Sequence, residues 1–143
     1  MLVQQLSVFL ENKPGRLLAA IEQLAANGVD ISALSIADTA EFGILRLIVD
    51  DPETAKAVLA KSGVVSRISD VIAIAMSDTP GGSVAILRLL SQNGFNIEYM
   101  YACVGKVSGK ALSLLRVDRP AEAEALLRQN GFGEINPAEI YRI

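Results

Sequence analysis

The chain has 143 residues, which is enough for one ordinary domain or two very small ones. With 51% hydrophobic and 20% charged residues, the composition predicts a packed core and excludes a disordered chain. The net charge of −3 comes without any basic cluster, which argues against nucleic-acid binding. No apolar stretch approaches the roughly 20 residues of a membrane span, and the first ten residues do not resemble a signal peptide, so we expect a cytoplasmic protein without membrane contacts.

Two further features of the composition argue against catalysis. The chain has no histidine, the commonest general base and transition-metal ligand. Its single cysteine, Cys103, cannot form an internal disulfide, and within the apolar run "YMYACVG" we expect a buried, unreactive thiol. We therefore predict a protein that is not an enzyme, with no catalytic residue, no metal and no cofactor.

The first half of the chain predicts a strand, a helix, two strands and a second helix. The apolar run Leu6–Leu10 predicts the first strand, and the pair Pro14-Gly15 separates it from a helix over 15–26 that Asn27-Gly28 ends with left-handed residues. The next elements are strands over 30–38 and 44–50, and a short helix in "DDPETAKAVLAKSG" with Pro52 at its first position. The acidic pair Asp50-Asp51 is explained by capping of that helix.

The second half repeats the first. Shifting the sequence by 66 positions, and by 68 after two extra residues, aligns identical residues in the same order: Pro14 with Pro80, Gly15 with Gly81, Asn27 with Asn93, Gly28 with Gly94, Asp50 with Asp118, and Pro52 with Pro120. The matching elements are a strand over 71–76, a helix over 81–92, strands over 96–104 and 111–118, a helix in "DRPAEAEALLRQNG" and a last strand, "EIYRI". The run "DVIAIAM" could both close the first copy and open the second.

This order of elements, in about 65 residues per copy, predicts an α+β fold of two tandem ferredoxin-like βαββαβ units with antiparallel sheets and helices on one face. The predicted domains are residues 1–70 and 71–143, with a strand around 71–76 open to sharing. Because a unit of this size is marginally stable alone, we expect the copies to cover one another and two chains to form a homodimer.

The repeated Pro-Gly joint has two interpretations. In the structural one, proline fixes φ for the first helical turn and glycine allows a sharp turn out of the strand. In the functional one, the first amides of the helix hold a small carboxylate, while Asn12 and Asp78 accept hydrogen bonds from an ammonium group. The second interpretation describes a free amino acid as ligand.

The stretch "SVFLENKPGRLLAAIEQLAANGVDISALSIA" resembles the opening of an ACT domain, a small regulatory module that binds amino acids. Both copies match, and the chain is similar over nearly its whole length to small stand-alone proteins made of two ACT domains. The resemblance implies a non-catalytic sensor with its effector bound where two ACT units meet. The alternative is a ligand-independent regulatory or scaffold subunit of an amino-acid metabolic enzyme.

The resemblance also implies which residues surround the ligand. Around the first joint these are Asn12, Lys13, Pro14, Gly15, Arg16 and Leu17, and around the second they are Asp78, Thr79, Pro80, Gly81, Gly82 and Ser83. The second strand of a facing copy would add Ile31 and Ser32, or Ile97, Glu98, Tyr99 and Met100. The two copies differ at several of these positions, so either one or both could bind. Tyr99 and Tyr101 share one strand face, as packing residues or as a ligand wall.

The segment "GKVSGKA" (residues 105–111) has some likeness to a phosphate-binding loop. Its spacing is too short for such a loop, and no serine or threonine follows the lysine. We therefore interpret it as a hairpin turn.

Overall fold

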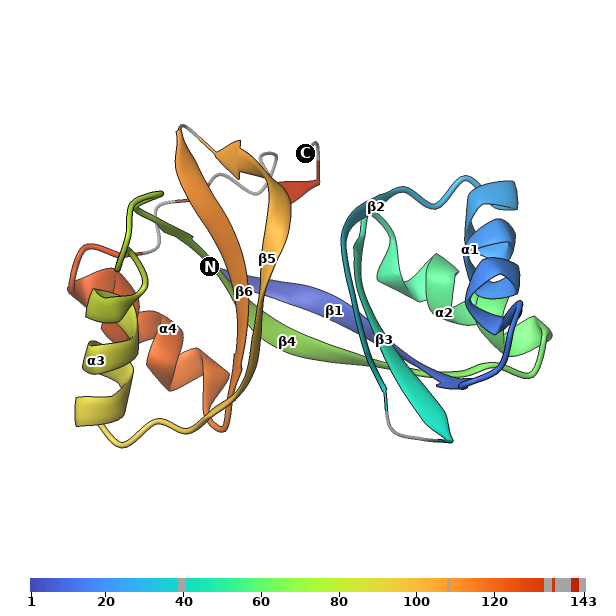
Figure 1. Cartoon of the computed structure of the whole chain (residues 1–143), viewed down its shortest axis with the longest axis horizontal. Coiled ribbons are helices and arrows are strands. Elements are labelled where there is room, and N and C mark those ends of the chain that lie inside the picture. The colour runs from blue at the N-terminus through green and yellow to red at the C-terminus, as the bar shows by residue number, and fades with distance from the viewer. Residues whose placement is uncertain (39–40, 108, 133–134, 136–139, 142–143) are drawn as a thin grey trace. The chain divides into compact units, whose positions relative to one another are not determined.

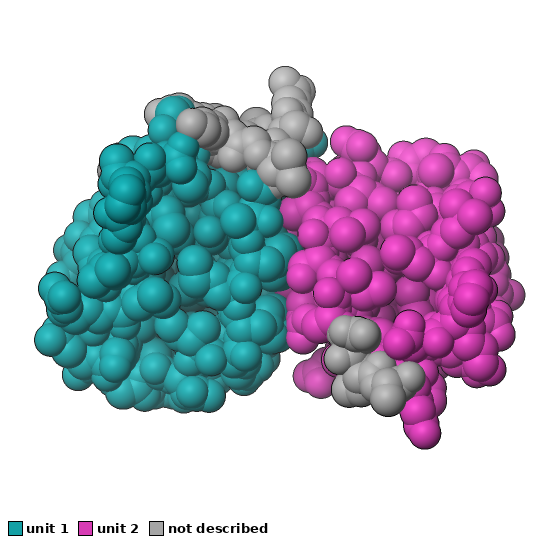
Figure 2. Space-filling view, viewed as in Figure 1, with its two compact units in different colours: residues 1–3, 70–143 teal, residues 4–69 magenta. Residues whose placement is uncertain are grey.

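The computed structural model describes residues 1–38, 41–107, 109–132, 135 and 140–141, and the chain forms two compact units (Figure 2). Unit 2 is Gln4–Ser69 and holds the first sequence copy, whereas unit 1 combines Met1–Val3 with Asp70–Ile143 and holds the second copy. None of the helices described is long and apolar enough to cross a membrane.

Unit 2 contains a four-stranded sheet with two helices on one of its faces (Figure 1). Its elements are β1 (Leu2–Glu11), α1 (Arg16–Ala26), β2 (Ile31–Asp38), β3 (Phe42–Val49), α2 (Pro52–Lys61) and the beginning of β4 (Val65–Met76). The strand order is β2-β3-β1-β4. Strand β3 pairs antiparallel with β1 and with β2, which places Glu11 opposite Phe42 and Ile31 opposite Val49.

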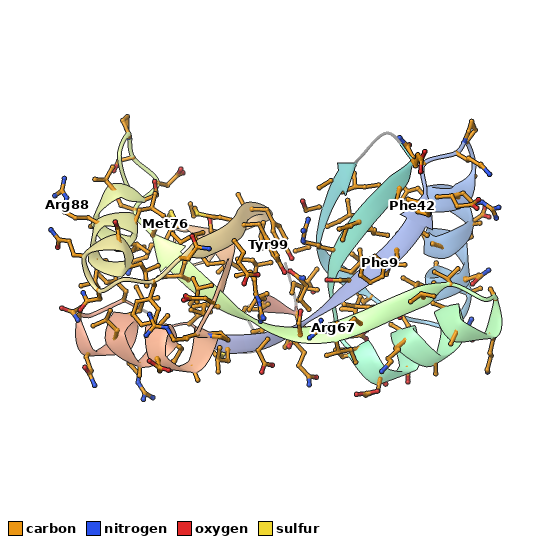
Figure 3. All side chains as sticks on the ribbon, turned by 90° about the horizontal axis from the view of Figure 1, so that it is seen from below. Phe9, Phe42, Arg67, Met76, Arg88 and Tyr99 are labelled. Atoms are coloured by element: carbon orange, nitrogen blue, oxygen red, sulfur yellow. The ribbon has the colours of Figure 1, made fainter. Side chains whose placement is uncertain are left out.

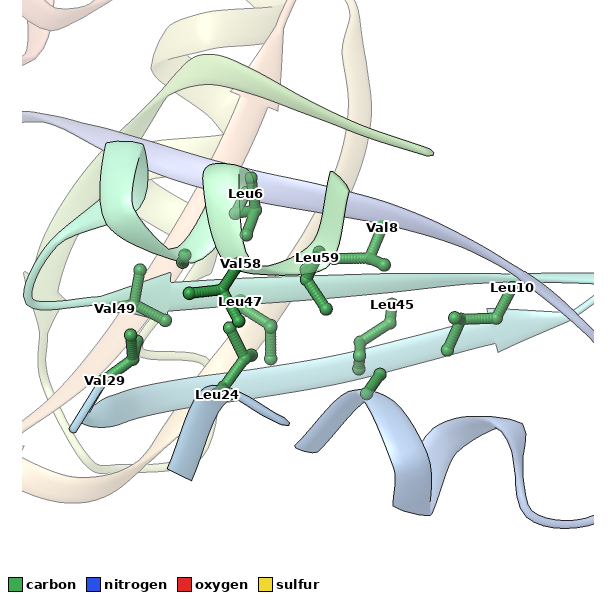
Figure 4. Close-up of a cluster of buried hydrophobic side chains, with 12 residues drawn as sticks. Leu6, Val8, Leu10, Leu24, Val29, Leu45, Leu47, Val49, Val58 and Leu59 are labelled. Atoms are coloured by element: carbon green, nitrogen blue, oxygen red, sulfur yellow. The ribbon is translucent and has the colours of Figure 1, made fainter. Parts of the chain in front are cut away.

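The core of unit 2 lies between this sheet and its helices (Figure 4). Alternate residues of β1 and β3 point toward the helices, as the period of two in a strand requires. Cross-strand pairs such as Leu6 with Leu47 and Val8 with Leu45 form the floor of the core. The helices contribute Ala20, Leu24, Ala55, Val58 and Leu59.

Unit 1 repeats this arrangement with the rest of β4, α3 (Val84–Gln92), β5 (Ile97–Val107), β6 (Lys110–Val117) and α4 (Pro120–Gln129). Strand β6 pairs antiparallel with β4 and β5, with Met76 opposite Ala111 and Ile97 opposite Val117. Its core is formed by Ile72, Ile74, Met76, Ile86, Leu90, Leu115, Val117, Ala123 and Leu127. The predicted α+β fold of two ferredoxin-like units is confirmed.

One edge of unit 1 is formed by a segment that we did not predict. The expected last strand, "EIYRI", lies mostly outside the described residues, and its described members Ile140 and Tyr141 are in a helical turn and a turn. Instead, the terminal ammonium of Met1 donates to the Ala73 carbonyl at 3.0 Å, and the Ala73 N–H donates to the Met1 carbonyl at 2.8 Å. The first residues of the chain therefore extend the sheet beside β4, a pairing over 72 positions that has no local sequence pattern.

Equivalent aspartates fix the connection between strands in both copies. The Asp50 carboxylate accepts from the Asp30 N–H at 2.9 Å, and the Asp50 N–H donates to the Asp30 carbonyl at 3.2 Å. Asp118 makes the same two bonds with Asn96, at 3.1 and 3.2 Å. The sequence predicted only a capping role for Asp50-Asp51, and Asp51 alone has it, accepting from the Thr54 N–H at 3.0 Å.

The helix boundaries follow the proline and glycine positions closely. Pro52 and Pro120 occupy the start of α2 and α4, as predicted. At the ends of α1 and α3 only the glycines are left-handed, with φ of 73° at both Gly28 and Gly94. The preceding asparagines have negative φ and donate instead from their side chains to carbonyls four residues earlier, so the prediction of a left-handed Asn-Gly pair was wrong for the asparagines.

Truncation of equivalent core leucines tests the independent cores of the two units. Leu24 and Leu90 are both 0% exposed, so we expect Leu24→Ala and Leu90→Ala each to lower the free energy of unfolding of their own unit by about 2–5 kcal/mol. Hydrogen exchange of backbone amides, read unit by unit, measures this loss. Leu18→Ala is the control on the same helix as Leu24, since Leu18 is 60% exposed and its truncation should cost little. An equal loss of unfolding free energy in Leu18→Ala would contradict this assignment of the core.

Candidate functional site

The second Pro-Gly joint is a tight turn between β4 and α3. Gly81 has a left-handed backbone with φ of 80°, which a residue with a side chain rarely adopts. The Gly82 N–H donates to the Thr79 carbonyl, and the Val84 N–H donates to the Gly81 carbonyl, both at 2.9 Å. These bonds span only three residues, so α3 begins at Val84, three residues later than predicted.

Gly82 is required by a close approach of two backbone segments. A Cβ atom at this position would overlap the Ser77 carbonyl and lie 3.1 Å from the Thr79 carbonyl oxygen. No residue with a side chain fits without moving the loop. The turn between β4 and α3 therefore requires glycine at this position.

A cavity of about 580 Å³ lies at this joint, lined only by residues of unit 1. Its lining consists of Ala75, Met76, Ser77, Asp78, Thr79, Gly82, Ala85, Ile86, Gly109, Lys110, Gly131 and Phe132. Met76 and Ile86 are 8% and 1% exposed and belong to the core, with Met76 at the end of β4 (Figure 3). Ser77, Asp78, Thr79 and Lys110 are exposed. The cavity thus has an apolar floor and a polar rim.

The rim carries groups of opposite charge and several hydrogen-bonding groups. Asp78 can accept from an ammonium group, and Lys110 can pair with a carboxylate. The hydroxyl oxygens of Ser77 and Thr79 lie 2.9 Å apart and form a hydrogen bond at the rim. This arrangement can bind a small molecule that has both charges at one end and an apolar group at the other.

Sequence reasoning missed Lys110 and Phe132 as parts of this site. The register of β4 with β6 places Met76 opposite Ala111, which brings the β5–β6 hairpin next to the joint. The "GKVSGKA" segment is this hairpin, in agreement with its interpretation as a turn, and it supplies Lys110 and Gly109 to the cavity. Phe132 comes from beyond α4, and neither residue lies near the joint in sequence. The pairing of β4 with β6 could have revealed Lys110, but only the packing of the segment after α4 could have revealed Phe132.

The first joint has the same backbone turn but different side chains. Gly15 is left-handed with φ of 83°, and α1 begins directly after it at Arg16. The Arg16 guanidinium donates from Nη2 to Glu11 Oε2 at 2.9 Å, and Lys13 Nζ lies 3.4 Å from the same oxygen. Hydrogen bonds from Lys13 and Arg16 hold the pKa of Glu11 below its ordinary value. The equivalent residues of the second joint are Ser77, Thr79 and Gly82.

The family model for the ACT domain pair matches residues 1–141. The chain belongs to the ACT domain pair family. A crystal structure of protein BT0572 from Bacteroides thetaiotaomicron is 36% identical, covers 100% of this chain and 98% of its own, and has a TM-score of 0.90. No curated protein sequence matches the chain at a significant level.

Two more distant structures share the fold. The regulatory subunit of aspartate kinase from Thermus thermophilus, in its ligand-free form, is 14% identical with a TM-score of 0.63, and covers 90% of this chain and 94% of its own. The same subunit from Thermus flavus is 20% identical with a TM-score of 0.62, and covers 90% of this chain and 92% of its own. At these identities the likeness concerns the fold alone.

Within each ACT unit, the predicted strand residues lie at the opposite end of the sheet from the joint. Ile31 pairs with Val49, whereas the first joint follows the pairing of Glu11 with Phe42. The same separation holds in unit 1 for the residues Ile97, Glu98, Tyr99 and Met100. The two predicted groups are therefore not brought together inside one unit, and a role for the strand residues stays a prediction.

The strand residues nevertheless share a local feature. Both strands carry a register shift, at Ile31/Ala33 in β2 and at Ile97/Tyr99 in β5. Glu98 in the second bulge lies 3.4 Å from Arg116 Nε. Tyr99 and Tyr101 are half-buried on one face of β5, opposite Arg116 and Leu114.

Chemistry at a reactive thiol or at a metal site is weakly supported. Cys103 is buried, as predicted, and desolvation raises the pKa of its thiol to about 11, which disfavours the reactive thiolate. Among the described residues no three His, Cys, Asp or Glu side chains gather as a metal site.

The ion cluster at the first joint gives a pH-dependent prediction. We expect the carboxyl of Glu11, followed by carbon-detected NMR, to titrate below the ordinary glutamate range, and Arg16→Gly to move its pKa upward. Because folding lowers this pKa, the stabilisation by the cluster exists above the unfolded pKa and is lost as the pH falls through the folded one. A Glu11 titration that Arg16→Gly leaves unaltered would contradict the pairing.

Proposed function

We propose that this ACT domain pair is a cytoplasmic, non-catalytic regulatory protein that binds a free amino acid as its effector. The observation that supports this most is the cavity at the second Pro-Gly joint, with its apolar floor and its rim of opposite charges. A free amino acid carries an ammonium and a carboxylate on one carbon and a side chain of variable character. These three parts match the three kinds of group that line the cavity.

In this proposal, Asp78 accepts hydrogen bonds from the ammonium, and Lys110 holds the carboxylate. Charge-assisted hydrogen bonds of this kind contribute more than neutral ones because one partner is ionised. The apolar side chains of Met76 and Ile86 then contact the side chain of the bound amino acid. Binding couples to regulation because the lining comes from β4, α3, β6 and the segment after α4, whose relative positions the ligand would fix.

The structural relatives support a regulatory role. Two of the solved structures with this fold are regulatory subunits of aspartate kinase, an enzyme of amino-acid metabolism. By analogy, the partner of this chain would be an enzyme of amino-acid metabolism whose activity follows the concentration of the effector. We also propose a homodimer, because a unit of this size buries little surface alone; sedimentation with and without ligand tests it.

The alternative function is a ligand-independent scaffold, and a specific observation favours it. Unit 2 exposes several large apolar side chains: Phe9, Leu34, Ile36 and Phe42. Phe9 and Phe42 lie on the neighbouring strands β1 and β3 (Figure 3). Exposed apolar groups of this size can mark a protein-binding surface. Capture of the same partner from a native extract with and without amino acids separates the two functions, since only a sensor changes its partner occupancy.

Calorimetry with the twenty amino acids tests the proposed function. We expect one or a few of them to bind, and Gly81→Ala to weaken that binding by about tenfold, because a side chain at this left-handed position shifts the loop that lines the cavity. Gly15→Ala is the matched control, since it imposes the same strain at the other joint. If none of the twenty amino acids binds, the protein is not an amino-acid sensor.

A further inference from the structure

We propose that Phe132 sets the size selectivity of the effector site, because its ring closes one side of the cavity and restricts the length of the ligand side chain. This inference rests on the proposed function and adds to it the residue that selects among amino acids. It is supported by a second cavity next to the first, by the fixed backbone position of Phe132 and by a smaller residue at the same position of unit 2.

The second cavity, of about 270 Å³, lies along α3. It is lined by Ala85, Arg88, Leu89, Gln92, Asn130 and Phe132. The lining residues from α3 follow one another at spacings of three and four, so they share one face of the helix. Ala85 and Phe132 also line the cavity at the second joint, and the two cavities therefore meet at this pair.

Of the two shared residues, Phe132 is the one large enough to form a wall. Ala85 has only a methyl group and is exposed in the first turn of α3. Phe132 is half-buried and packs against the core of unit 1. A ligand side chain that extends from the first cavity along α3 therefore meets the ring of Phe132.

The end of α4 fixes the backbone at Phe132 without help from its side chain. The Phe132 N–H donates to the Leu127 carbonyl at 2.9 Å, and the Gly131 N–H donates to the Arg128 carbonyl at 3.1 Å. Gly131 is left-handed with φ of 80°, as is common where a glycine ends a helix. Because these bonds join main-chain groups alone, a different side chain at residue 132 leaves them in place.

Unit 2 has the same helix end with a smaller side chain. There the Val64 N–H donates to the Leu59 carbonyl at 3.1 Å, directly after the left-handed Gly63. Val64 is partly buried against the core of unit 2, as Phe132 is against the core of unit 1. Valine is thus compatible with this position of an ACT unit, and we expect Phe132→Val to remove the ring and keep the fold.

Replacing the ring by valine would join the two cavities. The space gained lies along α3, where Leu89 offers apolar surface and Arg88 and Gln92 offer polar groups. A long ligand side chain could then extend past Ala85 and gain contacts, whereas a short one would only lose its contact with the ring. The size preference of the site should therefore follow the side chain at residue 132.

Calorimetry of the full-length wild type and of Phe132→Val with the twenty amino acids tests this inference. We expect Phe132→Val to favour larger side chains. The Kd of a larger amino acid, divided by the Kd of the one that the wild type prefers, should fall at least about tenfold. Val64→Ala is the matched control, because it shortens the side chain at the equivalent helix end of unit 2, and it should leave these ratios unchanged.

A purely structural role of Phe132 predicts a different result. Loss of packing against the core would weaken the binding of every amino acid by the same factor and leave the ratios of Kd unaltered. That result, equal changes of the ratios in Val64→Ala, or tightest binding of tryptophan by the wild type would overturn this inference and leave the proposed function standing. Absence of binding by every amino acid would overturn the proposed function together with this inference.

A second variant reports on the wall directly, because the chain has no tryptophan. Phe132→Trp places a single fluorophore at the wall, and its emission should change on addition of the preferred amino acid, whereas that of Val64→Trp should not. Loss of binding in Phe132→Trp alone would also support the inference, since the larger ring fills part of the cavity. Binding to Phe132→Trp by calorimetry without a change of emission would place the ligand away from the ring and overturn it.

Discussion

The candidate site depends on one steric constraint, the approach of Gly82 to the Ser77 carbonyl. Because this approach leaves no space for a Cβ atom, the chain after β4 must turn through bare backbone before α3 can begin. The cavity lies beside this turn, and Gly82 is one of its lining residues. In the first copy the equivalent residue is Arg16, which extends its side chain to Glu11 and starts α1 earlier. The joint lines a cavity in unit 1 and carries an ion cluster in unit 2.

The duplication explains why one chain contains both versions. The conformational requirements are common to the two copies: left-handed glycines at the joints and the helix ends, prolines at the start of α2 and α4, and the aspartates that fix Asp30 and Asn96. These residues are set by backbone geometry and could not change in either copy without cost. Charged and small residues around the joints have no such requirement, so they could diverge.

The sequence predicted the fold better than the site, for physical reasons. The periodicity of helices and strands and the positions of Pro and Gly are local properties of the sequence. They were sufficient to predict the order of the elements and the duplication. The pairing of the first residues of the chain with β4 was not predictable. Met1 reaches Ala73 through backbone hydrogen bonds that any residue can make. The sequence did not predict Lys110 and Phe132 as site residues for a related reason. Strand pairing brings Lys110 to the joint from about 30 positions away, and the end of α4 brings Phe132 from about 50 positions away. The start of α3 was placed too early because a helical period cannot detect the overlap at Gly82.

The central claim is that the cavity at the second joint receives the effector. Backbone-amide NMR during titration with the preferred amino acid tests this most directly, because both joints are observed in one experiment. The account predicts large shifts at Gly82, Ala85 and Lys110, with Gly15, Arg16 and Ala19 unmoved. Shifts confined to Gly15 and Arg16, or equal at both joints, would contradict it.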